Sequence, residues 1–153
     1  MAKQSISAKD SSPLAKLYIY TRNLIASMEI IPTAAPFPSF AQLKSSPDKF
    51  YELFSNATYN YNVICDALQK LQHTNAMIVK TLNDLLSPEC TEGYEIKSQY
   101  TKKFTAARTE CIALISAYET AKASSESVVK FYNSAQYVIT SNGRNFDGTS
   151  ANY

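Results

Sequence analysis

Apolar residues recur at steps of three and four along most of the chain, which is the spacing of one face of an α-helix. The strongest pattern predicts a helix over 58–86, and Ser87 followed by Pro88 ends it. The residues that carry this pattern are Tyr61, Ile64, Leu68, Leu71, Asn75, Ile78, Leu82 and Leu85.

Two shorter patterns precede it. Ser12 and Pro13 predict a helix start, because a serine hydroxyl caps free N–H groups and proline fits the first turn. The pattern then runs to Ile31, before a proline-rich connector. A second, less regular helix is predicted to restart at Ser46–Pro47 and to end by Ala57. Two further apolar residues could form its first turn, Phe40 and Leu43.

A fourth pattern runs from Ile96 to Ala121 and resumes over 128–138. Unbroken, this helix would span about 65 Å, much longer than its partner. We therefore expect a break or bend near Ser124–Ser125, or an end that projects beyond the bundle.

These patterns predict an all-α fold, an antiparallel four-helix bundle with irregular N- and C-terminal segments. Residues 1–153 are expected to form a single domain. Within it we expect a loose N-terminus over 1–11, the bundle over 12–140 and a C-terminal tail over 141–153.

Composition limits the classes of partner that the chain can bind. Charged residues make up 18% of the chain and the formal net charge is +2. This balance is too weak to hold nucleic acid by bulk charge, so any such contact must be local or repeated across many subunits. A polar surface with little charge suits contact with other protein. No apolar run is long enough to predict a membrane span.

The chain carries no recognisable catalytic or metal-binding motif, so we do not expect an enzyme. His73 is the one histidine, which excludes zinc sites built on several histidines. An enzyme that uses His73 or a cysteine is the weakest alternative. Three widely spaced cysteines favour free thiols in a reducing compartment, and they are Cys65, Cys90 and Cys111.

Basic residues gather where the third and fourth predicted helices meet. Because these two helix ends flank the same loop, the cluster indicates phosphate binding, with Tyr94 and Tyr100 as candidates for stacking or sugar contact. The alternative is a solvated positive face opposite the acidic loop. The basic residues are Lys80, Lys97, Lys102, Lys103 and Arg108, and the loop acids are Glu89, Glu92 and Glu95.

Two segments resemble the coat proteins of tobamovirus-like rod-shaped RNA viruses. Residues 50–54 (Phe-Tyr-Glu-Leu-Phe) are similar to the Phe-x-Glu-x-Trp segment that ends the second helix of that family. Residues 59–68 resemble its Tyr-x-Tyr-Asn-x-x-x-Asp-x-Leu segment, which opens the third helix. Residues 107–110 are similar to its Arg-x-Asp, and residues 142–147 to its C-terminal Asn-Arg-x-x-Phe-Glu, one residue shorter here.

The resemblance implies a four-helix subunit that stacks with many copies of itself into a helical rod around single-stranded RNA. It implies location in the virion, and in the host cytoplasm during assembly. Arg108, Lys80, Lys102 and Lys103 would face the RNA backbone and neutralise phosphates. The arginines that the family carries after the middle of its third helix fall on Val79 and Thr81, which leaves Lys80 as the nearby cation.

The resemblance also assigns a role to two acids that would otherwise be ordinary surface residues. Glu52 and Asp66, expected in consecutive helices, match the family's carboxylates that repel each other across a contact between subunits. Protonation or a bound Ca²⁺ would remove that repulsion. No other cofactor is implied. The alternative function is a cellular four-helix interaction or scaffold module that binds no nucleic acid.

Overall fold

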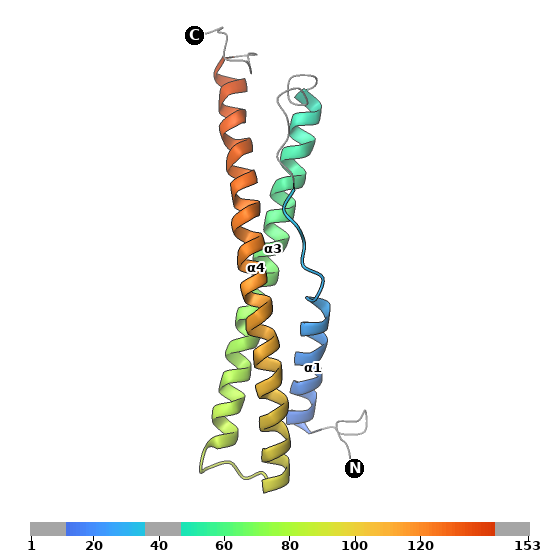
Figure 1. Cartoon of the computed structure of the whole chain (residues 1–153), viewed down its shortest axis with the longest axis vertical. Helices are drawn as coiled ribbons and strands as arrows, with labels where there is room; N and C mark the ends of the chain where they lie inside the picture. Colours follow the sequence, from blue (N-terminus) through green and yellow to red (C-terminus); the bar gives the residue numbers. More distant parts are fainter. Residues whose placement is uncertain (1–11, 36–46, 143–153) are drawn as a thin grey trace. The chain divides into compact units, whose positions relative to one another are not determined.

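The computed structural model describes residues 12–35 and 47–142, and within these ranges it contains three helices and no strand (Figure 1). The helices are α1 (Pro13–Ser27), α3 (Pro47–Leu86) and α4 (Tyr94–Asn142). The all-α class is therefore confirmed. The expectations for residues 1–11, for Phe40 and Leu43, and for residues 143–153 lie outside the described residues.

Helix α1 begins where the sequence predicts. The Ser12 hydroxyl accepts a hydrogen bond from the Ala15 backbone N–H at 3.1 Å, and Pro13 opens the first turn. The helix ends at Ser27, before the predicted end at Ile31, and the N–H of Met28 closes its last turn.

The predicted boundary between the second and third helices is wrong, because residues 47–86 form one continuous helix of 40 residues. No connection interrupts Ser55–Thr58. Every seventh residue of α3 is buried through this stretch, a spacing typical of helices that pack side by side over many turns. These residues are Phe50, Ala57, Ile64, Leu71, Ile78 and Leu85.

The predicted break near Ser124–Ser125 is also wrong, because α4 is continuous over 49 residues. Ser125 itself is 2% exposed and continues the buried positions of this helix at the same seven-residue spacing. The part of α4 beyond Ser125 is packed at least as far as Ala135, because Val128, Tyr132 and Ala135 form a core with Phe50 and Ala57. The buried series along α4 is Phe104, Cys111, Tyr118, Ser125 and Tyr132.

The contacts divide the chain into two compact units. One unit joins α1 to Leu68–Ala117, which comprises the second part of α3, the connecting loop and the first part of α4. Its core includes the Tyr18 ring, which meets the edge of Phe104 with 5.4 Å between ring centroids. Whether residues 1–153 fold as a single domain stays a prediction.

The other unit joins Ile31–Ala67 to the part of the chain that starts at Tyr118. Aromatic rings dominate its core. Phe54 stacks on Tyr132 with ring centroids 5.5 Å apart and an interplanar angle of 10°, and Phe50 meets Tyr132 at 5.8 Å. The Asn60 side-chain amide donates to the backbone carbonyl of Thr33 at 2.9 Å and ties the segment after α1 to α3.

Candidate functional site

Arg108 and Lys102 are both exposed on α4. Among the described residues neither side chain makes an ion pair. They lie six residues apart, which separates them by about 120° around the helix axis. Each side chain could reach a phosphate. A straight segment of RNA backbone lying along one face of α4, however, could not contact both.

Lys103 has a partner within its own unit. Its ammonium group lies over the Tyr18 ring, 5.3 Å from the ring centroid, and the side chain is half-buried. A cation held over an aromatic face is stabilised by the ring quadrupole. Lys103 and Arg108 are five residues apart, about 140° around the axis, so the side of α4 that meets α1 is not the side that presents Arg108.

Lys80 lies on the exposed face of α3 and pairs with Asp84 at 3.2 Å, one helical turn away. The side chains of both residues are largely exposed, so the pair is weak and Lys80 remains accessible. Along α4, Lys102 and Lys103 therefore do not share a helix face with Arg108. Lys80 presents its charge from another helix, α3.

The two tyrosines considered for stacking differ in exposure. Tyr94 is 84% exposed at the start of α4, whereas Tyr100 is 4% exposed and packs near Tyr18. The expectation that Tyr100 is available to a ligand is therefore wrong for the folded chain. The reason is that Tyr100 lies four residues before Phe104, on the face of α4 that α1 covers.

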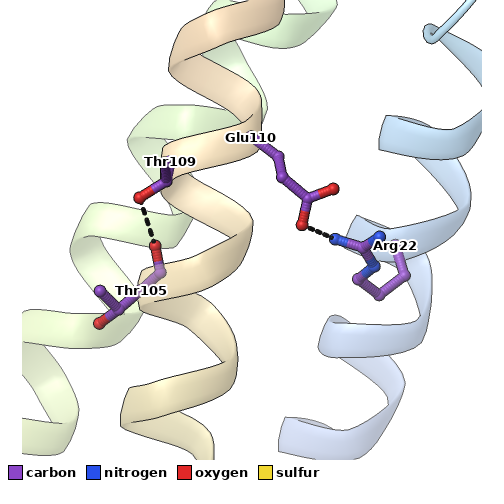
Figure 2. Close-up of polar contacts among 4 residues, drawn as sticks. All are labelled: Arg22, Thr105, Thr109 and Glu110. Carbon is purple, nitrogen blue, oxygen red and sulfur yellow. Dashed lines mark hydrogen bonds and ion pairs between the residues drawn. The ribbon is translucent and has the colours of Figure 1, made fainter.

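An ion pair that the sequence did not indicate joins α1 to α4. The Arg22 guanidinium donates to the Glu110 carboxylate with 2.6 Å between Nη1 and Oε2 (Figure 2). This hydrogen bond raises the pKa of Arg22 above its ordinary value, while partial burial opposes the rise. Glu110 is the acid of the segment 107–110, so its carboxylate is engaged within the chain. Thr109 on the same turn bonds back to the carbonyl of Thr105 at 3.2 Å.

Glu52 and Asp66 lie on one helix, not on two consecutive helices as expected. Fourteen residues of α3 separate them, which is about 21 Å along the axis, so the two carboxylates of one chain do not meet. Both are exposed, and Glu52 forms a long ion pair with Lys49 at 3.5 Å. Their predicted role needs the partner acid to come from another subunit.

A shallow groove of about 460 Å³ lies on α3 over the stretch 51–62, which includes Glu52 and ends before Asp66. Its lining carries no charge and combines aromatic, hydroxyl and amide side chains. Tyr59 is 72% exposed and Tyr51 is 47% exposed, while the neighbouring Phe54 also contributes to the core. The lining residues are Tyr51, Phe54, Ser55, Thr58, Tyr59 and Asn62.

The cysteines occupy different surroundings. Cys111 is fully buried, its thiol donates to the Leu71 backbone carbonyl at 3.3 Å, and burial raises the pKa of this thiol. A buried thiol with a raised pKa is a poor nucleophile. Cys65 and Cys90 are free and half-buried, and His73 is exposed on α3.

The described parts of the chain contain neither a group of metal ligands nor a helix suited to a lipid bilayer. No group of three or more histidine, cysteine, aspartate or glutamate side chains is placed to hold a metal ion. None of the described helices combines the length and apolar character needed to cross a lipid bilayer.

Comparison with known proteins adds no relative. No family model matches the chain, and neither a curated protein nor a solved structure matches it.

Proposed function

We propose that the chain is a structural coat protein that assembles helically around single-stranded RNA into a rod-shaped virion. The proposal includes the four-helix form of the subunit, the virion as its location and the host cytoplasm as the place of assembly. It rests on the resemblance of residues 50–54 and 59–68 to tobamovirus-like coat proteins, and on the surface that these residues present.

The groove on α3 is the observation that carries the proposal. It is uncharged, about 460 Å³ in volume and lined by two exposed tyrosines. Exposed aromatic residues with few neighbouring charges are typical of surfaces that contact other protein. Both resembling segments contribute to it, through Tyr51 and Phe54 from the first and Tyr59 and Asn62 from the second. This supports repeated contact between copies of the chain.

The exposure of Arg108 and Lys102 supports RNA binding. A cation with no partner in the described chain can neutralise a phosphate without losing an internal ion pair. Lys80 would exchange Asp84 for the phosphate, and Lys103 would leave the Tyr18 ring. We therefore assign the larger share of RNA contact to Arg108 and Lys102. With a net charge of only +2, such contacts act by repetition along one strand.

The exposed carboxylate of Glu52 lies within the stretch of α3 that forms the groove, and that of Asp66 lies four residues beyond its last lining residue. In the proposed rod, Glu52 of one subunit approaches Asp66 of the next, and their repulsion is relieved by protonation or by Ca²⁺. Because the acids of a single chain are about 21 Å apart, this cation site would exist only between subunits.

Electron microscopy of the purified protein at several pH values, with and without added single-stranded RNA, tests the proposal. Discs or rods whose length follows that of the RNA are expected. The variant Tyr59→Ser removes the most exposed ring of the groove and should reduce assembly, whereas Tyr20→Ser on α1 serves as a matched exposed control. Single small particles under every condition would contradict the proposal and favour the interaction or scaffold module.

A further inference from the structure

One exposed face of α3 has a symmetric arrangement of residues about Tyr59. Charged residues lie seven and eleven positions to either side of this tyrosine, and uncharged residues lie four positions to either side. At about 100° per residue, these positions fall within roughly 40° of Tyr59 around the helix axis. Each of them is exposed, and Tyr59 is 72% exposed. We call this face the α3 stripe, and it consists of Asp48, Glu52, Ser55, Tyr59, Val63, Asp66 and Lys70.

The ends of the α3 stripe are complementary in charge when two copies of α3 run antiparallel. With Tyr59 opposite Tyr59 of a second copy, Asp48 lies opposite Lys70 of that copy, because both residues are eleven positions from the centre. By symmetry this pair forms twice. A parallel alignment would instead place each charge opposite the same charge. Electrostatic complementarity therefore favours the antiparallel orientation with Tyr59 at the centre.

Two acids and one further lysine complete the charges along this part of α3. Glu52 lies opposite Asp66 of the second copy, and these carboxylates repel each other. Lys49 pairs with Glu52 at 3.5 Å and offsets part of that repulsion. Between Asp48 and Lys70 the sequence carries no other charged residue. Each end of the paired stripes therefore groups three acids with two lysines, which leaves a small excess of negative charge.

A charged pair of α4 lies on the other side of α3. The Glu126 carboxylate interacts with the Tyr61 hydroxyl, and it pairs with Lys130 at 3.7 Å. Tyr61 is two residues after Tyr59, so it is turned by about 160° from the centre of the α3 stripe. These two charges of α4 therefore face away from a second copy that packs on the stripe.

The centre of the α3 stripe borders the uncharged groove. Tyr59 and Ser55 both line this groove, whose volume is about 460 Å³. In the antiparallel arrangement the Tyr59 ring of each copy lies beside the groove of the other, where its burial removes no charge from water. Tyrosines buried at the centre of an interface are among the side chains that contribute most to binding. A second copy of the chain therefore fits this surface.

We propose that, in the absence of RNA, two copies of the chain form a closed dimer through antiparallel α3 stripes, with the two-fold axis at Tyr59. A two-fold contact closes on itself, whereas a rod grows by head-to-tail contacts. The dimer is therefore a form of the free chain, and it must open before the groove can serve in a rod. It goes beyond the proposed function and does not rest on RNA binding.

Disulfide crosslinking tests the position of the two-fold axis. In a background with Cys65→Ser and Cys90→Ser, the variant Tyr59→Cys should crosslink to its own copy on oxidation in air with copper phenanthroline, because residues on the axis come within disulfide reach. Asn62→Cys is the matched control, an exposed residue of the same groove. Its two copies would lie about 9 Å apart along the helix axis and should not crosslink.

The alignment of the two helices has its own crosslinking test. Glu52→Cys mixed with Asp66→Cys should give crosslinked dimers that contain one chain of each variant. Either variant alone should not crosslink, because its two thiols would be about 21 Å apart along the axis. Equal crosslinking of Tyr59→Cys and Asn62→Cys, or no crosslink in the mixture, would overturn the proposal.

Sedimentation equilibrium without RNA and under reducing conditions tests the charge pairs. Asp48→Lys and Lys70→Asp should each weaken the dimer by about tenfold, and the two exchanges combined in one chain should restore it. Circular dichroism checks that each variant keeps its helices. Lys80→Asp, which breaks an exposed pair on α3 outside the stripe, is the control and should leave the dimer unchanged.

A free chain that stays monomeric at all concentrations would overturn the proposal, and so would a double exchange that fails to restore the dimer. These results are separate from those that test the coat protein. A chain that is monomeric without RNA and still forms rods on RNA would overturn the dimer alone.

Discussion

Arg22 on α1 and Glu110 on α4 form an ion pair with 2.6 Å between donor and acceptor, and it crosses between two helices of the same unit. The side chains are 34% and 42% exposed, so water screens the pair. Its main effect is to fix the side of α4 that α1 covers, in agreement with Lys103 over Tyr18 seven residues earlier on α4.

The first prediction concerns this ion pair. A double-mutant cycle of Arg22→Gln and Glu110→Gln should give a coupling free energy of about 0.5–1 kcal/mol, the upper part of the range for solvent-exposed pairs. Chemical denaturation with circular dichroism measures it. The corresponding cycle on Lys80 and Asp84, which are 78% and 67% exposed, should give less. Equal coupling in the two cycles would contradict the structural role assigned to Arg22.

The second prediction concerns a buried hydroxyl without a partner. Thr74 is 1% exposed, and its Oγ1 has no hydrogen-bond partner among the described residues. Thr74→Val keeps the shape and removes the unsatisfied group, so it should raise the free energy of unfolding by about 1 kcal/mol. Thr81→Val is the matched control, because the Thr81 hydroxyl donates to the Met77 carbonyl at 2.9 Å. That control should not be stabilising, and the opposite order of the two variants would contradict the assignment.

The sequence predicted the helix ends better than the helix interiors. Ser12 with Pro13 and Ser87 with Pro88 are local signals, and both mark real ends. The predicted division at Ser55–Thr58 is wrong because this short polar stretch does not end the helix: Phe50, Ala57 and Ile64 continue one buried series through it.

The break expected at Ser124–Ser125 failed for a similar reason. A serine has modest helix propensity, but Ser125 occupies a buried position between Tyr118 and Tyr132, and packing of this face outweighs a local preference. The second reason for expecting a break is that the fourth predicted helix is much longer than the third. This difference in length is smaller in the structure, because α3 has 40 residues.

The candidate site was predictable only as a set of residue types. The sequence places Lys103 and Arg108 on one helix, but it does not say which flank of that helix α1 covers. Contact with Tyr18 engages Lys103 and leaves Arg108 exposed. The same docking of α1 pairs Arg22 with Glu110, a contact across 88 positions of sequence that no local pattern indicates.

The third prediction concerns stability at high pH. Burial raises the pKa values of Cys111, Tyr118 and Tyr132 above their ordinary values. The unfolded chain therefore releases these protons at lower pH than the folded chain. The stabilisation is fully present below about pH 8, under the ordinary pKa values of these groups, and is lost as the pH rises through the folded-state pKa values, by up to about 1.4 kcal/mol per group per pH unit.

Denaturation at pH 8 to 11 measures this loss. Tyr132→Phe should reduce the slope of unfolding free energy against pH, since one titrating buried group is removed. Tyr20→Phe replaces a tyrosine that is 51% exposed and should leave the slope unchanged. If Tyr132→Phe left it unchanged as well, the burial effect on the phenol would be refuted.

The fourth prediction concerns the carboxylates of the proposed rod. If Glu52 and Asp66 of neighbouring subunits repel, protonation relieves the repulsion, so assembly is favoured at low pH and weakens as the pH rises. Glu52→Gln or Asp66→Asn should then give rods that persist to higher pH and need less Ca²⁺. Light scattering during a pH titration records the shift. Glu119→Gln, an exposed acid on α4, is the control that should leave the midpoint in place.

The fifth prediction separates RNA binding from folding. Arg108→Glu should lower RNA packaging several-fold while the helical content and unfolding midpoint stay near those of the parent chain, because Arg108 is exposed and unpaired within the described residues. Lys70→Glu reverses an exposed charge on α3 and serves as the control. Equal RNA packaging by the two variants would show that Arg108 does not contact the RNA.

Protection of RNA from ribonuclease distinguishes a coat protein from a scaffold module in a single measurement. The purified protein is mixed with single-stranded RNA of defined lengths, treated with ribonuclease and sedimented, and the RNA in the pelleted particles is measured. The coat-protein account predicts fast-sedimenting particles whose protected RNA matches the input length. Complete digestion of the RNA, with the protein remaining at the top of the gradient as a small species, would contradict it.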